Sequence, residues 1–190
     1  MTVRVVAVSG TLHAPSKTDV VVRAAVDSAR EQLGSAREQA SAAASGGLEA
    51  HTIGVLALRE ELARSLPGGP TPAVQEALDF VRQADVLVVA TPVYKGSYTG
   101  LLKLFIDFLG RGDIADVPIV LAAIGGSQEH SLVIEHELRP LFGFFSAAPV
   151  AEPLYLQPAD FAGEGVTSAA ALRIARAVGQ ALAAATRRAA

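Results

Sequence analysis

The sequence of 190 residues contains no cysteine and no tryptophan, and only 5% of its residues are aromatic. The absence of cysteine excludes disulfide frameworks, thiolate metal sites, thiol nucleophiles and cysteine-ligated clusters. Long apolar runs are also missing. Residues 101–109 are interrupted by Lys103 and Asp107, and no stretch reaches the roughly 18 apolar residues of a membrane span. The first residues lack a signal-peptide pattern. We therefore expect a soluble, cytoplasmic protein with no membrane partner.

An excess of charge of one sign is absent as well. Sixteen Lys and Arg stand against nineteen Asp and Glu, which gives a formal net charge of −3. Such a chain has no overall electrostatic attraction to nucleic acid, and we expect no nucleic-acid partner. Apolar residues make up 51% of the chain and charged residues 18%, a balance typical of a globular protein with a well-buried core. The length predicts a single domain, residues 1–190.

Short apolar segments alternate with helical patterns along the chain. The predicted strands are residues 3–8, 48–53, 85–90, 119–124 and 150–156. The predicted helices are residues 17–33, 72–83, 98–109, 131–141 and 166–187. Pro153 favours an edge position for the last strand. This alternation predicts an α/β flavodoxin-like three-layer sandwich, with a five-stranded parallel sheet in the order 2-1-3-4-5 and helices on both faces.

Two connecting segments have distinctive compositions. Residues 34–47 are rich in Ala, Ser and Gly and predict a frayed helix end followed by a linker. Residues 62–72 contain three Pro and two Gly and predict a loop. Thr71 is the expected N-cap of the next helix, because Pro72 suits the first helical position.

Ligands of such sheets bind beyond the carboxyl ends of the strands, which singles out three loops. The first loop, residues 9–18, lies between a buried strand and a helix N-terminus, where unpaired N–H groups and the helix dipole favour an anion. Its hydroxyl and basic side chains add donors, so we interpret it as a phosphate cradle. Plain capping of the helix by Ser16 or Thr18 is the alternative. Walker A and GxGxxG motifs are absent.

The second loop, residues 91–100, has the sequence TPVYKGSYTG and is the most unusual segment of the chain. Gly96 permits a close approach of backbone to a ligand, and Pro92 and Tyr94 supply apolar surface for a flat heterocycle. The third loop, residues 125–127, begins with Gly125 and Gly126 and offers bare backbone at the next strand end. The topology predicts that all three loops form one pocket.

The four histidines are scattered. We predict that His51 is a surface residue, that His130 is exposed or caps a helix, and that His136 is a core or interface residue. Only His13 lies within a predicted binding loop. No pair has a spacing such as HExxH, so no metal site is predicted. No motif links a nucleophile to a base, so no catalytic side chain is predicted.

At these loops the sequence resembles the NAD(P)H-dependent FMN reductase family, which has a flavodoxin-like fold. The likeness extends from residue 3 to residue 147. Residues 9–18 (SGTLHAPSKT) resemble that family's loop for the FMN phosphate, and residues 91–103 resemble its isoalloxazine loop and following helix. Residues 124–127, His130 and residues 137–140 resemble the segment beyond its fourth strand. The chain is most similar to the reductases of two-component systems, which pass reduced FMN to a flavin-dependent monooxygenase.

The resemblance implies an oxidoreductase that transfers a hydride from NAD(P)H to FMN, without a side-chain acid or base. The FMN-binding residues that it implies are Ser9, Thr11, His13, Ser16, Lys17, Thr18, Pro92, Val93, Tyr94, Lys95, Gly96, Ser97, Gly125 and Gly126. The chain departs from the family in two places. Many members have Arg where His13 stands. Alkanesulfonate-type reductases carry an inserted Tyr in a π-bulged helix at an oligomer interface, where this chain has His136, and the sequence leaves the bulge open.

Two other functions stay open at this point. One is an FMN-bound NAD(P)H quinone or azo reductase. The other is a flavodoxin-type electron carrier, against which the modest charge and the absence of tryptophan weigh. The helix from Tyr98 to Leu109 is apolar nearly all round, whereas a helix beside a sheet need bury only one stripe. We therefore predict a homodimer or homotetramer through this helix and the His136 helix, with a centrally buried helix as the alternative.

Overall fold

The computed structural model describes residues 2–39, 47–66 and 68–189. Its main sheet runs in the order β2-β1-β3-β4-β5, with β6 also paired to β4, and every ladder in it is parallel. The predicted strand order 2-1-3-4-5 is therefore confirmed. The strands of this sheet are β1 (Val3–Ser9), β2 (Leu48–Gly54), β3 (Val86–Pro92), β4 (Pro118–Ile124), β5 (Ala148–Pro149) and β6 (Leu154–Leu156).

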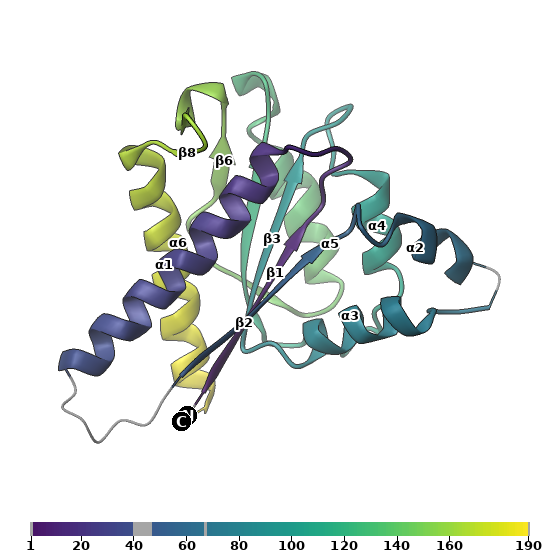
Figure 1. Cartoon of the computed structure of the whole chain (residues 1–190), viewed down its shortest axis with the longest axis horizontal. Helices are drawn as coiled ribbons and strands as arrows, with labels where there is room; N and C mark the ends of the chain where they lie inside the picture. The colour runs from purple at the N-terminus through teal and green to yellow at the C-terminus, as the bar shows by residue number, and fades with distance from the viewer. Residues whose placement is uncertain (1, 40–46, 67, 190) are drawn as a thin grey trace.

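Helices cover both faces of the sheet (Figure 1). The helices are α1 (Lys17–Gln39), α2 (Arg59–Ser65), α3 (Pro72–Arg82), α4 (Gly100–Ile106), α5 (Arg139–Gly143) and α6 (Ser168–Ala189). Helices α1 and α6 bury one face, and α2 to α5 bury the other. In β1, Val5 faces α1 and α6 while Val6 faces the opposite layer, and both are buried. Burial on both faces explains why the strands are apolar at almost every position.

The fifth predicted strand, residues 150–156, is wrong in detail. β5 and β6 are separate short strands, and residues 150–153 belong to neither. Pro149 precedes this interruption and Pro153 is its last residue, and proline has no N–H to donate to a ladder. A small antiparallel hairpin of β7 (Phe161–Ala162) and β8 (Gly165–Val166) follows β6.

Two predicted helix boundaries and one predicted loop also change. α1 continues through Gln39, while residues 40–46 of the predicted linker lie outside the described residues. Residues 62–65 are not loop but the end of α2, which is anchored by the fully buried Leu62 and is too short to show a helical period. α4 begins only at Gly100, because Thr99 is its N-cap. Thr71 is the N-cap of α3 as predicted, although its side chain makes no capping hydrogen bond.

The predicted helix at residues 131–141 is not one regular α-helix. A 3₁₀ turn, η1 (Gln128–His130), precedes a π-helical turn, η2 (Ile134–Leu138), which leads into α5. The π-bulge, whose presence the sequence did not decide, is thus present and contains His136. Pro140 has no N–H for the carbonyl of residue 136, so a regular α-helix cannot continue through this point. His136 is exposed, which rules out the core alternative for it. Within the described residues, no helix is long and apolar enough to cross a membrane.

Candidate functional site

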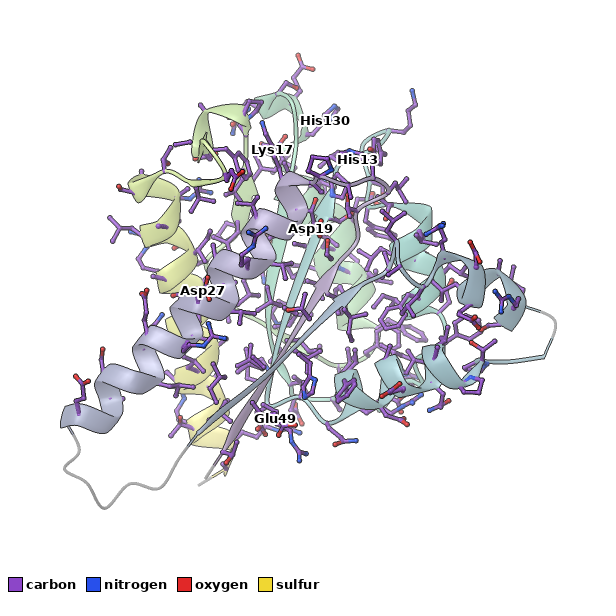
Figure 2. The ribbon with its side chains drawn as sticks, in the orientation of Figure 1. His13, Lys17, Asp19, Asp27, Glu49 and His130 are labelled. Atoms are coloured by element: carbon purple, nitrogen blue, oxygen red, sulfur yellow. The ribbon has the colours of Figure 1, made fainter. Side chains whose placement is uncertain are left out.

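The carboxyl ends of β1, β3 and β4 are neighbours at one edge of the sheet, and the residues that follow β1 and β3 are hydrogen-bonded to the next strand. The Gly10 N–H donates to the Ala90 carbonyl over 2.7 Å, and the Val93 N–H donates to the Ile124 carbonyl over 2.8 Å. The structure therefore brings the three predicted loops together. Figure 2 shows His13 and Lys17 at this end of the molecule and Glu49 at the opposite end.

The first and second loops are joined by the buried side chain of Thr99. Its hydroxyl donates to the Gly10 carbonyl over 2.7 Å and accepts from the Leu102 N–H over 3.2 Å, which caps α4. A Cβ on Gly10 would lie 3.0 Å from Leu102 Cδ2 and 3.2 Å from the Ala90 carbonyl, so this contact requires glycine. Sequence analysis did not single out Thr99. Its position directly before an apolar helix is the pattern that could have identified it.

The start of α1 offers hydrogen-bond donors. Ser16 is the N-cap: its Oγ accepts from the Thr18 N–H over 3.1 Å, and its carbonyl accepts from the Val20 N–H over 3.3 Å. The capping interpretation of Ser16 is therefore confirmed, and it does not exclude a ligand. Among the described residues, the N–H groups of Ser16, Lys17 and Asp19 have no acceptor. The hydroxyl proton of Ser16 is also free to donate. A set made of donors alone fits an anion such as a phosphate.

Other polar side chains of the first loop hold it from inside. Ser9 and Thr18 are each only 1% exposed, and Thr11 is buried as well. The Ser9 hydroxyl donates to Asp19 Oδ1 over 2.5 Å, which ties the end of β1 to the first turn of α1. The Thr11 hydroxyl donates to the carbonyl of His13 over 3.0 Å. These hydroxyl groups shape the loop from within.

His13 and Lys17 are the exposed side chains of this loop that carry, or can carry, positive charge. His13 Nδ1 donates to the Pro15 carbonyl over 3.2 Å, which holds the ring against its own loop. The Lys17 ammonium lies 4.9 Å from the centroid of the Phe161 ring in β7. A cavity of about 520 Å³ beside this turn is lined by Ser16, Lys17, Arg23 and Glu164, among others.

The second loop contains a tight turn at residues 94–97. The N–H of Tyr94 donates to the Ser97 carbonyl over 2.9 Å, and the N–H of Ser97 donates back over 3.1 Å. Lys95 and Gly96 have φ angles of +53° and +80°, as the two central residues of a type I′ turn require. Gly96 is needed for this angle and not for close packing, because a Cβ there would meet nothing within 4 Å. Tyr94 is 41% exposed.

Tyr155 of β6 supports the third loop, and sequence analysis did not identify it. Its hydroxyl donates a short hydrogen bond to the Ser127 carbonyl, and burial raises the pKa of this phenol. A Cβ on Gly125 would fall 1.8 Å from the Tyr155 hydroxyl oxygen. Gly126 is exposed and has open space around its Cα. Gly125 is therefore needed for packing, whereas Gly126 is the glycine that faces outward.

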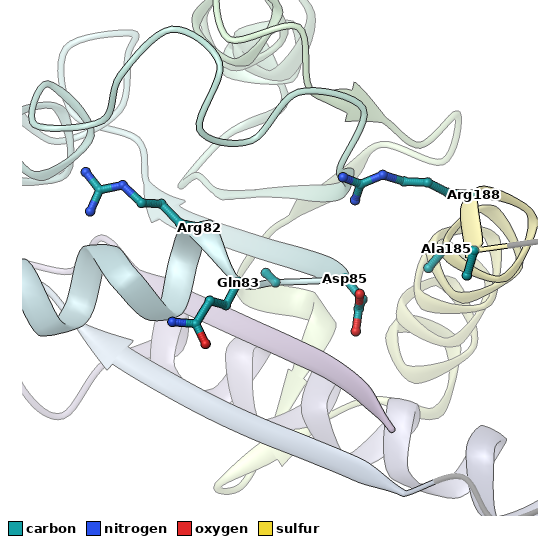
Figure 3. Close-up of a pocket in the computed structure, with 7 residues that line it drawn as sticks. Arg82, Gln83, Asp85, Ala185 and Arg188 are labelled. Atoms are coloured by element: carbon teal, nitrogen blue, oxygen red, sulfur yellow. The ribbon is translucent and has the colours of Figure 1, made fainter. Parts of the chain in front are cut away.

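A different cavity, of about 350 Å³, lies at the amino ends of the strands (Figure 3). Arg82, Asp85 and Arg188 are among its lining residues, and Asp85 directly precedes β3. This is the edge opposite the three loops. Parallel α/β sheets bind ligands beyond the carboxyl ends, so we assign the candidate site to the loops.

The other histidines lie outside the three predicted loops, and Figure 2 shows His130 at the same end of the molecule as His13. His51 is at the surface as predicted, although its side chain is only 30% exposed because the ring stacks on Phe80 with centroids 3.9 Å apart. Hydrogen bonds from His51 and Arg4 lower the pKa of Glu49. His130 is exposed, in agreement with its prediction. Among the described residues, no three His, Asp or Glu side chains group as metal ligands would.

The strand order and the three loops at its carboxyl edge define a flavodoxin-like α/β protein. Residues 3–161 match the family described as NADPH-dependent FMN reductase, and the chain belongs to this family of oxidoreductases, which use FMN and NAD(P)H. The match continues past residue 147, where the resemblance in the sequence ended.

Relatives and a solved structure agree with this assignment. The chain is 40% identical to the NADH-dependent FMN reductase SfnF of Pseudomonas fluorescens over 87% of this chain and 82% of that protein. It is 37% identical to the FMN reductase (NADPH) of Pseudomonas aeruginosa over 83% and 78% of the two chains. An oxidoreductase structure from Corynebacterium diphtheriae superposes with a TM-score of 0.86 at 30% identity, covering 98% of each chain.

Proposed function

We propose that this chain, as a single flavin-binding domain, reduces FMN with NAD(P)H and releases the reduced flavin to a flavin-dependent monooxygenase. The observation that carries the proposal is that the three loops follow neighbouring strands at one edge of the sheet, where Thr99 bonds the second loop to the first and the Val93 N–H bonds it to the end of β4. The donor-only start of α1 supports phosphate binding there. The relatives, which are named as FMN reductases, support the reaction.

The proposed FMN contacts follow the three loops. The phosphate is held by the free N–H groups around Ser16 and Lys17, the Ser16 hydroxyl, and the charge of Lys17 and His13. Ser9, Thr11 and Thr18 act indirectly in this site, because their buried hydrogen bonds and packing hold the phosphate loop in shape. The flavin ring and ribityl chain lie against residues 92–97 and the glycines of the third loop, namely Pro92, Val93, Tyr94, Lys95, Gly96, Ser97, Gly125 and Gly126.

In this mechanism the protein binds and orients the reactants. Bound FMN supplies a ring that accepts a hydride from the nicotinamide. Gly126 is exposed, so its backbone N–H would be able to donate to a bound flavin, and a fixed donor stabilises developing negative charge without reorganising. No side chain is needed to deliver a proton to the ring, because water reaches this exposed edge. The exposure of Tyr94, Lys95 and Gly96 supports the release of FMN as a product.

Turnover assays distinguish the proposed reaction from its alternatives. We expect saturable oxidation of NADH or NADPH that depends on added FMN and is followed at the nicotinamide absorbance. Turnover only with a quinone or an azo dye would instead favour the FMN-bound reductase. A tightly bound yellow flavin without turnover would indicate an electron carrier. A coupled assay tests the transfer of reduced flavin: a flavin-dependent monooxygenase is added to the protein with NAD(P)H and FMN, and formation of its product is measured.

FMN titration of the apo-protein, followed by fluorescence quenching, tests the site itself. Ser16→Ala and Tyr94→Ala should each weaken FMN binding, since they remove a phosphate donor and an apolar contact. Ser35→Ala, an exposed serine further along α1, is the matched control and should bind FMN like the wild type. Unchanged affinity in both site variants would overturn the assignment of these loops.

We propose that the protein is a homodimer or homotetramer that forms through α4 and the His136 segment. In α4 and the turn after it, Leu102 and Phe105 are buried in the core, whereas Leu101, Leu104 and Phe108 are only partly buried. Leu132 and Phe144, on either side of η2 and α5, are 58% and 60% exposed. Apolar side chains that are exposed or only partly buried favour association. The proposed location is the cytoplasm, where a reductase has a supply of NAD(P)H.

Light scattering at micromolar concentration tests the oligomer. We expect Leu132→Glu to shift the protein toward monomer, because it places a charge in the proposed interface. Leu66→Glu changes a leucine that is 64% exposed at the end of α2 and should leave the mass unchanged. A monomeric wild type would refute the association.

A further inference from the structure

The turn at residues 94–97 is held by a side-chain hydrogen bond from a distant part of the chain. The Ser97 hydroxyl donates to Glu137 Oε2 over 2.8 Å, and the two residues are 40 positions apart. Both side chains are half-buried. The backbone bonds between Tyr94 and Ser97 close the turn on itself. The bond to Glu137 ties this turn to η2, on the same side of the sheet.

The π-helical turn explains why Glu137 is available for this contact. Ile134 and Leu138 are both buried in the core, which fixes η2 against the sheet. Glu135 points to the outside and forms an ion pair with Arg139 at 2.7 Å. Among the described residues Glu137 takes part in no salt bridge, and its hydrogen-bond partner is Ser97. Its carboxylate is thus directed at the second loop rather than at a neighbouring cation.

The charge of Glu137 is also felt at the next residue of the loop. Burial raises the pKa of the Tyr98 phenol, and Lys103 opposes this effect. The negative charges of Glu137 and Asp107 raise it further. The carboxylate thus bonds to Ser97, and its charge also acts on Tyr98, the residue before the N-cap of α4.

We propose that Glu137 is a positioning residue for the FMN-binding turn, which it holds in its binding geometry by accepting the Ser97 hydrogen bond. This inference rests on the proposed contact between the turn and FMN. Glu137 itself need not touch the flavin. A turn that is already ordered loses less conformational entropy when a ligand binds, so its affinity for that ligand is higher.

The test is a set of variants titrated with FMN by fluorescence quenching of the apo-protein. Removing a single hydrogen bond typically weakens binding by about three- to tenfold, so we expect this loss for Glu137→Ala and for Ser97→Ala. The double variant should bind no more weakly than Ser97→Ala alone, because both changes remove the same bond. Glu137→Gln retains an acceptor oxygen and should stay within about twofold of the wild type. In turnover, KM for FMN should rise while kcat stays nearly constant.

Glu135→Ala is the matched control, since it removes a carboxylate from the same turn and breaks the Arg139 ion pair without touching Ser97. It should bind FMN like the wild type. Thermal unfolding of each variant verifies the fold, and Ser97→Ala with Glu137→Gln completes the test if Glu137→Ala does not fold.

Three other outcomes would contradict either the role of Glu137 or the proposed function. If the wild type binds FMN and Glu137→Ala binds it equally well, the role of Glu137 is overturned while the proposed function stands. Strictly additive losses in the double variant would also overturn it, because Glu137 would then act by another route than Ser97. A wild type that does not bind FMN would refute the proposed function itself.

Discussion

The hydroxyl of Thr99 donates a hydrogen bond to the backbone carbonyl of Gly10 across 89 positions of the sequence. The same oxygen caps α4 by accepting from the Leu102 N–H. One buried side chain thus sets the distance between the loop after β1 and the helix after β3. This bond ties the proposed phosphate loop to the segment that we assign to the flavin ring.

Replacement of Thr99 by valine should affect stability and FMN affinity together. Valine keeps the shape of the side chain but removes the helix cap and leaves the Gly10 carbonyl unpaired, a loss of about 2 to 4 kcal/mol. Urea unfolding measures this loss, and FMN titration of the folded variant should show weaker binding. Thr99→Ser keeps the hydroxyl and should lose only about 1 kcal/mol through the missing methyl group. Equal stabilities for the two variants would contradict this role.

Substitutions at Lys95 and Gly96 should change the free energy of unfolding in opposite directions. Asparagine tolerates a positive φ better than lysine, so Lys95→Asn should raise the free energy of unfolding by about 0.5 to 1 kcal/mol. Gly96→Ala places a Cβ on a residue at φ +80° and should lower the free energy of unfolding by about 1 kcal/mol. Thermal unfolding of both variants measures these shifts. A stabilising Gly96→Ala would show that the turn has another conformation in solution.

Much of the fold could be predicted from local sequence alone. Residues 86–90 are apolar without exception, and such a run is typical of a strand buried on both faces. The alternation of strands and helices, together with the rules for crossovers, then predicted a parallel sheet. Its order was taken from the flavodoxin-like topology, which fits five strands in a chain of this length. The three loops could be placed for the same reason, since a parallel sheet aligns its carboxyl ends. The split of the last strand and the short helix α2 could not, because two- or three-residue strands and a single buried leucine give no period.

The residues that sequence analysis missed act through distant partners. Thr99 bonds to Gly10, Glu137 to Ser97 and Tyr155 to Ser127, over 89, 40 and 28 positions. Each has an ordinary local context, a threonine before a helix, a glutamate on a helix and a tyrosine in a strand. Their roles come from packing of layers, which a single sequence does not encode in any short pattern. Gly125 and Gly126 likewise look alike in the sequence, and only Tyr155 distinguishes them.

Alanine substitutions at the two adjacent glycines should therefore have different effects. In Gly125→Ala the new methyl group meets the buried Tyr155 hydroxyl, so the ring or the third loop must move, at a cost of about 1 to 3 kcal/mol. FMN affinity should fall with it. In Gly126→Ala the methyl group enters open space, and stability should change by no more than about 0.5 kcal/mol. Urea unfolding of the pair provides the measurement. Comparable losses in both variants would contradict the packing role of Tyr155.

Acid unfolding should depend on the ion pair between Asp113 and Arg82, whose Oδ2 and Nε atoms are 2.7 Å apart. Burial alone would raise the pKa of Asp113, but hydrogen bonds from the Gly110 N–H and from Arg82 outweigh it and lower this pKa. A carboxyl with a lowered pKa in the folded state stabilises the protein above the unfolded value of about 4, and loses that contribution as the pH falls through the folded value. Asp113→Asn should therefore be less stable than the wild type at pH 7, and the difference should shrink below about pH 4. Urea unfolding at a series of pH values measures this difference. A gap between the two proteins that stays constant down to pH 2 would show that the Asp113 carboxylate adds no charge-dependent stability.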